Sequence, residues 1–225
     1  MDSPKLFINC CILLFLLTFS AYPARAQDAP DPDSRLYNGH EYIRNGINAK
    51  GFPFFLDDRL QPGTLVYDGI FYKDIPLQYD LVLDELIIQD YTGKTLISLI
   101  PEKVNSFHIG THIFRYLPGT PSVKTGFYEE LCSGRDSINL FARREKRLVY
   151  PSNTEESARY VLHNTYFLRI GNTYSQVDYE SSLLAAMRDK KAVVKKYIHD
   201  NNIRFNKDFE NALIQTTLYY CKLTN

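Results

Sequence analysis

Turn signals recur through the middle of this chain at intervals of about 8 to 12 residues, and this spacing limits the fold more than any other feature. Between the turns lie short segments rich in branched and aromatic residues, none of them long enough for a helix. The expected strands are 64–67, 70–72, 77–83, 86–89, 95–100, 106–109, 112–117, 127–132, 138–142, 166–170 and 174–177. The pattern predicts an antiparallel β-meander that forms a curved sheet or a partly open barrel.

After Asp178 the apolar period changes from 2 to 3.6. Three short apolar stripes follow, which predict about three C-terminal helices over residues 178–225. Asp178, Asp189 and Asn206 stand where helix N-caps are expected. The expected fold class is therefore α+β, with the helices following the sheet.

The first 26 residues have the three parts of a secretory signal peptide. Lys5 supplies a positive charge, 6–19 is almost entirely apolar, and cleavage is expected between Ala26 and Gln27. The alternative is a membrane anchor, but about 14 apolar residues span only about 21 Å of a hydrocarbon core about 30 Å thick. We therefore expect an exported protein, periplasmic or extracellular.

The chain that remains after cleavage is expected to have two parts. The polar, proline-bearing segment 27–35 is expected to be a flexible leader, and 36–225 a single β-rich domain that includes the C-terminal helices. No later stretch has 18 consecutive apolar residues, so no membrane span is expected in the mature chain.

Two cysteines, Cys132 and Cys221, remain after cleavage, because Cys10 and Cys11 leave with the signal. An oxidising compartment permits a bridge between them. The alternative is two buried free thiols that never meet, and sequence alone leaves both open.

Charge and motif content exclude several classes of function. Lys plus Arg and Asp plus Glu both number 26, and a neutral chain lacks the cationic surplus of a dedicated nucleic-acid binder. No nucleotide, metal or nucleophile motif is present, so no cofactor is expected.

Several segments resemble a family of uncharacterised secreted bacterial proteins. The resemblance lies in 63–69, 76–81, 127–131, 143–146, 171–174 and 181–184, and in the closing helices. It implies export, one domain and a β-rich body followed by helices. It implies no activity and no functional residue.

Four groups of residues are candidates for chemistry or binding. His108 and His112 would share a helix face at metal-ligand spacing, but a strand context separates them by about 13 Å. The four aspartates could supply a glycosidase pair, or serve turns and local hydrogen bonds. They are Asp68, Asp74, Asp80 and Asp84.

The other two groups concern surfaces. The 17 tyrosines could form a sugar- or peptide-binding face or simply occupy strands. Four lysines on one expected helix could touch anionic lipid or form a solvated face. They are Lys190, Lys191, Lys195 and Lys196.

Two functions follow as hypotheses. The first is an exported, non-enzymatic binding or envelope-associated module with a polymer, lipid or protein partner. The second is an extracytoplasmic hydrolase that acts on an envelope or extracellular polymer through carboxylates between Asp68 and Asp84.

Overall fold

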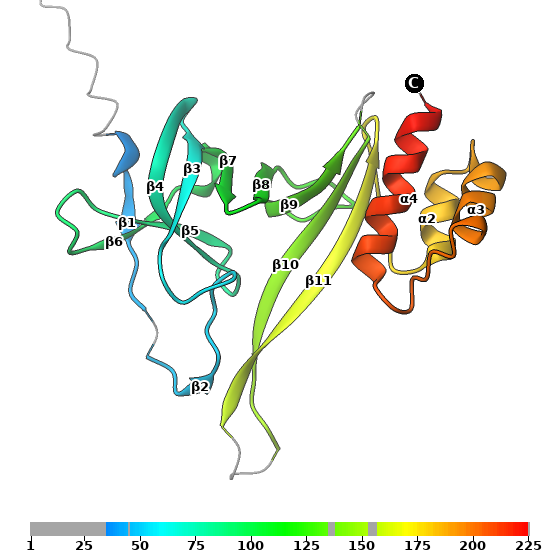
Figure 1. Cartoon of the computed structure of the whole chain (residues 1–225). Coiled ribbons are helices and arrows are strands. Elements are labelled where there is room, and N and C mark those ends of the chain that lie inside the picture. Colours follow the sequence, from blue (N-terminus) through cyan, green and yellow to red (C-terminus); the bar gives the residue numbers. More distant parts are fainter. Residues whose placement is uncertain (1–34, 45, 135–137, 153–156, 225) are drawn as a thin grey trace, which may run out of the picture. The chain divides into compact units, whose positions relative to one another are not determined.

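The computed structural model describes residues 35–44, 46–134, 138–152 and 157–224 (Figure 1). The expected signal peptide, its cleavage point between Ala26 and Gln27, and the leader except Arg35 lie outside these residues. The described part confirms an α+β fold, with a mostly open antiparallel sheet followed by three C-terminal helices.

The sheet has the strand order β1-β6-β5-β4-β3-β7-β8-β9-β10-β11-β12, and β2 pairs in parallel with β11. Its strands are β1 (Gly39–Glu41), β2 (Ala49–Lys50), β3 (Gln61–Tyr67), β4 (Ile70–Asp80), β5 (Glu85–Gln89), β6 (Leu96–Leu99), β7 (Val104–Ile109), β8 (His112–Leu117), β9 (Gly126–Ser133), β10 (Asn139–Val149), β11 (Ala158–Ile170) and β12 (Thr173–Gln176).

The order departs from a simple meander at β1, which pairs with β6, at β2, which pairs with β11, and at the step from β6 to β7. A 3-10 turn, Pro101–Lys103, carries the chain from β6 to β7, which pairs with β3 instead of β6. β3 thereby lies between β4 and β7, and strands β3 to β9 contribute side chains to one hydrophobic core.

Local turn chemistry is as the sequence predicts at Asp68-Gly69. Both residues have positive φ, 52° and 76°, and Tyr67 pairs with Ile70 across them. This is the two-residue hairpin turn that matches the right-handed twist of the strands, and Asp and Gly tolerate its backbone.

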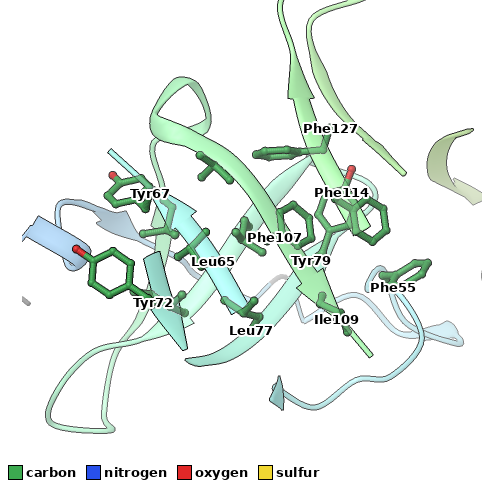
Figure 2. Close-up of a cluster of buried hydrophobic side chains, with 14 of the residues drawn as sticks. Phe55, Leu65, Tyr67, Tyr72, Leu77, Tyr79, Phe107, Ile109, Phe114 and Phe127 are labelled. Carbon is green, nitrogen blue, oxygen red and sulfur yellow. The ribbon is translucent and has the colours of Figure 1, made fainter. Parts of the chain in front are cut away.

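Aromatic rings dominate the first core (Figure 2). Phe114 stacks on Phe107 with centroids 4.8 Å apart, and Tyr79, Phe127 and Phe55 meet this pair edge-on at 4.9–5.3 Å. Such tilted contacts suit the ring quadrupoles and fill the core densely.

The long hairpin of β10 and β11 is the main departure from the expected strand lengths. The ladder runs from Asn139↔Arg169 to Val149↔Arg159, well beyond the predicted segments 138–142 and 166–170. Only residues 139–142 of β10 pair with β9, so the remainder of β10 forms a two-stranded ribbon with β11. We call this segment, 143–149 with 159–165, the ribbon.

The three helices are α2 (Glu180–Ala186), α3 (Lys191–Asp200) and α4 (Phe209–Leu223). They pack through the predicted apolar stripes onto sheet residues such as Leu140 and Leu168. All three predicted N-caps were wrong by one or two residues. α4, for example, is capped by Asp208, whose carboxylate accepts from Asn211 N at 3.1 Å.

No helix in the described ranges has the length and apolar character needed to cross a membrane.

Candidate functional site

A pocket of about 220 Å³ lies between the ribbon, the turn after β4 and the segment before β3. We call it the Asp80 pocket. Its lining residues are Tyr42, Arg44, Ile47, Gly51, Phe52, Pro53, Phe54, Asp58, Asp80, Val82, Leu83, Leu148 and Tyr160.

Asp80 lies at the end of β4, is only 2% exposed and has both oxygens occupied. One oxygen accepts from the Tyr42 hydroxyl at 2.7 Å, and the other accepts from Val82 N and Leu83 N at 2.7 and 3.0 Å. Burial, together with the neighbouring Asp80 carboxylate, raises the pKa of Tyr42, so its hydroxyl keeps its proton and remains the donor. Asp80 therefore holds the pocket wall and the following turn in place.

A second polar group forms at Arg44. Its guanidinium donates to Asp58 Oδ1 at 3.0 Å and to Gln78 Oε1 at 2.8 Å. It also lies 4.8 Å from the centre of the Phe54 ring, a cation–π contact. These bonds fix the loop that carries Asp58 against β4.

Lys146 of β10 joins the ribbon to the segment before β3. Its ammonium donates to Phe52 O and Phe54 O at 3.0 and 2.6 Å and lies 4.4 Å from the Phe52 ring centre. Burial lowers the pKa of this amine. In addition, Lys146 N donates to Leu81 O at 2.9 Å, so main chain and side chain together position this wall of the pocket.

Apolar side chains surround the mouth of the Asp80 pocket. Ile47, Val82 and Leu83 are 45%, 42% and 47% exposed. Leu148 and Tyr160, which pair across the ribbon, line its inner side. The pocket thus combines an apolar entrance with a polar interior whose groups bind one another, as ligand pockets commonly do.

The four candidate aspartates do not converge on one cleft. Asp68 is an exposed turn residue beside Lys103, and Asp74 is an exposed residue within β4 beside Lys73. Asp80 faces the Asp80 pocket, whereas Asp84 binds elsewhere.

Asp84 belongs to a buried group around Arg143. It accepts from the Tyr79 hydroxyl at 2.6 Å and pairs with Arg143 Nη2 at 2.8 Å. Burial raises the pKa of Asp84, and the guanidinium and the tyrosine hydroxyl oppose that rise. Its φ of 60° is one that Asp tolerates well, which confirms the expected turn role.

A second buried ion network joins the sheet to α4. Arg144 lies 2.6 Å from both Glu129 Oε2 and Glu210 Oε2, and the Tyr166 hydroxyl donates to Glu210 at 2.9 Å. His112 Nδ1 lies 2.5 Å from the other Glu129 oxygen. Sequence reasoning missed this network because its members come from five separate elements.

The histidine pair does not form a metal site. Register pairs His108 with Ile113 and Ile109 with His112, so the two imidazoles lie on opposite faces of the β7–β8 hairpin. No cluster of three metal-ligating side chains occurs among the residues that the structure describes.

Cys132 on β9 and Cys221 on α4 are unbonded thiols in the same region of the helix-side core. Burial raises the pKa of Cys132 to about 12, and the neighbouring Cys221 adds to the rise. A thiol with so high a pKa is a poor nucleophile at neutral pH. The bridge between them stays a prediction.

The surface candidates are spread over the molecule. The four lysines lie exposed on or beside α3, and Lys196 pairs with Asp200 at 2.6 Å. Several tyrosines are core residues, among them Tyr67, Tyr79 and Tyr128, whereas Tyr42 and Tyr160 line the Asp80 pocket.

Comparison with protein-family models, curated proteins and solved structures finds no match to this chain.

Proposed function

We propose that this protein is an exported, non-enzymatic binding module whose Asp80 pocket receives an apolar side chain of a protein partner. The observation that carries the proposal is the pocket itself. Three exposed apolar residues, Ile47, Val82 and Leu83, stand at the entrance to a cavity in which Asp80 and Arg44 are already hydrogen-bonded to neighbouring groups. Binding there buries apolar surface while Asp80 and Arg44 keep their hydrogen bonds.

The hydrogen bonds of Asp80 favour binding over catalysis. A general acid or base must offer a free oxygen to the substrate, whereas both Asp80 oxygens already accept from the chain. The other carboxylate that lines the pocket, Asp58, is held by Arg44. Hydrolysis by a carboxylate pair therefore receives no support from this geometry.

An open strand edge next to the pocket favours a polypeptide as the partner. On the side of β11 away from β10, pairing with β2 ends at Arg159, and pairing with β12 involves only Phe167 and the residues after it. Among the described residues no strand pairs with 160–165 on that side. Val161 and Leu162 are 39% and 50% exposed there. An extended peptide can add to such an edge by main-chain hydrogen bonds while a side chain enters a neighbouring pocket.

The binding step can be tested with single-residue probes. N-acetyl-leucinamide and N-acetyl-phenylalaninamide are titrated into protein with labelled Ile, Leu and Val methyl groups, and N-acetyl-glycinamide serves as the probe without a side chain. We expect methyl shifts confined to Ile47, Val82, Leu83 and Leu148, with Kd on the order of 1 mM. The glycine probe should leave these methyls unchanged.

Two variants make this test specific. Val82→Asp places a charge at the pocket mouth and should abolish the shifts at Ile47 and Leu148. Val193→Asp makes the same change on α3 at a residue of similar exposure, 46%, and should leave them intact. Shifts that persist in Val82→Asp, or that spread equally over α3, would contradict the proposed site.

Intact-mass analysis of the protein from its native host tests export and the predicted bridge together. The mass should correspond to a chain beginning at Gln27, because the signal peptide is removed on export. In denatured, non-reduced protein Cys132 and Cys221 should resist alkylation, because a bridge leaves no free thiol. A bridge that closes a loop of this length is expected to stabilise the fold by about 4–5 kcal/mol in the chain-entropy model. A retained Met1 would refute export, and two freely alkylated thiols would refute the bridge.

A further inference from the structure

Positive charge is concentrated on α3 and on the turn that precedes it. Residues 188–200 hold five Lys or Arg and two Asp, although the whole chain has 26 residues of each sign. Four of these cations are exposed and line one shallow depression of about 420 Å³ together with Val193. They are Arg188, Lys190, Lys191 and Lys195. We call the four cations and Val193 the α3 patch.

The two aspartates of this stretch are engaged with other groups. Asp189 borders the same depression, and its carboxylate accepts from the Tyr220 hydroxyl at 2.8 Å. Asp200 pairs with Lys196 at 2.6 Å. In the part of the chain that the structure describes, no ion pair joins a cation of the α3 patch to a carboxylate. Their charges therefore remain available to an external anion.

Exposed cations on the sheet provide a contrast. Arg59 lies 2.8 Å from Asp57, and Lys73 lies 3.7 Å from Asp74. Each of these charges is balanced by its own neighbour, so it attracts a distant anion only weakly. The imbalance of charge on α3 gives this helix a local positive field in a chain that is neutral as a whole.

The charges of the α3 patch also destabilise the helix that carries them. Lys191 and Lys195 are four residues apart, where like charges on a helix repel. Lys190 is the N-cap and Lys191 the first helical residue, and no acidic residue stands in the first turn. Cations at that end oppose the helix macrodipole. A negatively charged surface outside the protein would relieve both repulsions.

Val193 favours a lipid surface over a soluble polyanion. Its side chain is 46% exposed and borders the same depression as the four cations. A bilayer presents phosphate groups directly beside an apolar layer, so long cationic side chains can stay with the phosphates while a neighbouring apolar side chain is buried. A soluble polyanion supplies the charge but offers no apolar phase for Val193.

We propose that the α3 patch docks this protein on a membrane surface that contains anionic phospholipid. α3 itself stays folded on α2 and α4, because Val194 and Ile198 belong to the helix-side core (Figure 1). The contact is therefore peripheral and reversible. The α3 patch shares no lining residue with the Asp80 pocket, so this proposal does not depend on what binds there.

Vesicle flotation with the full-length mature protein tests the proposal. Phosphatidylcholine vesicles with about 30 mol% phosphatidylglycerol are compared with phosphatidylcholine alone at about 50 mM salt, where charges are weakly screened. We expect binding to the anionic vesicles only, with half-saturation on the order of 1 mM lipid, because each of four cations contributes about a fivefold gain. Salt of about 500 mM should release the protein.

A triple variant removes the lysines of the α3 patch. Lys190→Gln/Lys191→Gln/Lys195→Gln should bind the anionic vesicles about a hundredfold more weakly, which abolishes detectable flotation. Its urea midpoint should be no lower than that of the unmodified protein, because the substitutions relieve repulsion on α3.

The matched control Arg59→Gln/Lys73→Gln/Lys94→Gln removes the same net charge from exposed positions outside α3 and should keep the affinity within about twofold. Val193→Ser keeps every charge and should weaken vesicle binding about threefold, because less apolar surface is buried.

The proposal would be overturned by equal binding to vesicles without anionic lipid, by absence of binding to the anionic vesicles, or by an equal loss in the control triple variant. Poly-L-glutamate at the same concentration of negative charge is the competing ligand. If it binds as tightly as the vesicles, or if Val193→Ser binds them unchanged, the patch attracts polyanions in general and is not a lipid-docking surface.

Discussion

Replacing Arg144 by methionine is expected to lower the free energy of unfolding by about 3–5 kcal/mol, as is typical when one partner of a buried ion pair is removed. Arg144 is 8% exposed and lies 2.6 Å from both Glu129 and Glu210. Without the guanidinium, Glu129, which is 4% exposed, keeps a buried negative charge. Urea denaturation at neutral pH measures the loss.

The matched control is Arg147→Met, which removes the same group from an exposed position on the same strand and should change stability by less than about 0.5 kcal/mol. The double variant Glu129→Leu/Arg144→Met should recover much of the loss, because it leaves no charge buried at Glu129. If Arg144→Met is as stable as the unmodified protein, the ion network does not stabilise the fold as predicted.

At acidic pH the free energies of unfolding of Arg144→Met and of the unmodified protein should differ less than at neutral pH. Burial raises the pKa of Glu210, but Arg144 and the Tyr166 hydroxyl outweigh it and hold the pKa below its ordinary value of 4.5. A carboxyl with a lowered pKa stabilises the fold above its unfolded-state pKa, and this contribution is lost as pH falls through its folded-state pKa. Urea midpoints of both proteins at neutral pH and below pH 4.5 test the sign.

Phe114→Ala is expected to lower the free energy of unfolding by about 3–5 kcal/mol, because it removes a fully buried ring and leaves a cavity in the first core. The ring stacks on Phe107 and meets Phe55 and Tyr79 edge-on at 4.9 and 5.1 Å (Figure 2). The neighbours belong to separate elements and cannot all collapse into the space. Thermal and urea unfolding measure the loss.

Phe71→Ala provides the control for this substitution, since the Phe71 ring is 62% exposed. Its removal should lower the free energy of unfolding by less than about 1 kcal/mol. Phe114→Leu should recover part of the lost stability by refilling the cavity. Equal effects of Phe114→Ala and Phe71→Ala would show that the ring stack is not a main source of stability.

Much of the fold could be predicted because the signals are local. The hairpin at Asp68-Gly69 needs only two residues that accept positive φ, and the alternation on each side places one face in the core. The buried residues Leu183 and Leu184 of α2 and Met187 at its C-cap follow the period of 3.6 in the same way.

The candidate sites were less predictable. Local hydrogen bonding is one of the two roles that the sequence offers for Asp80, and Asp80 does accept hydrogen bonds from Tyr42 and Val82. Its partner Tyr42 is 38 positions away, and no local pattern points to it. The ribbon was missed because the charged run 143–147 is typical of a surface loop.

By itself the sequence determined the strands, the turns between them and the helical stripes, since each depends on the backbone preferences of neighbouring residues. Only the tertiary structure decided that β7 returns to β3 and that Arg143 and Arg144 are buried in a ribbon. The physical reason is that a charge can be buried only where its partners are, and Asp84 and Glu210 reach these arginines from distant parts of the chain.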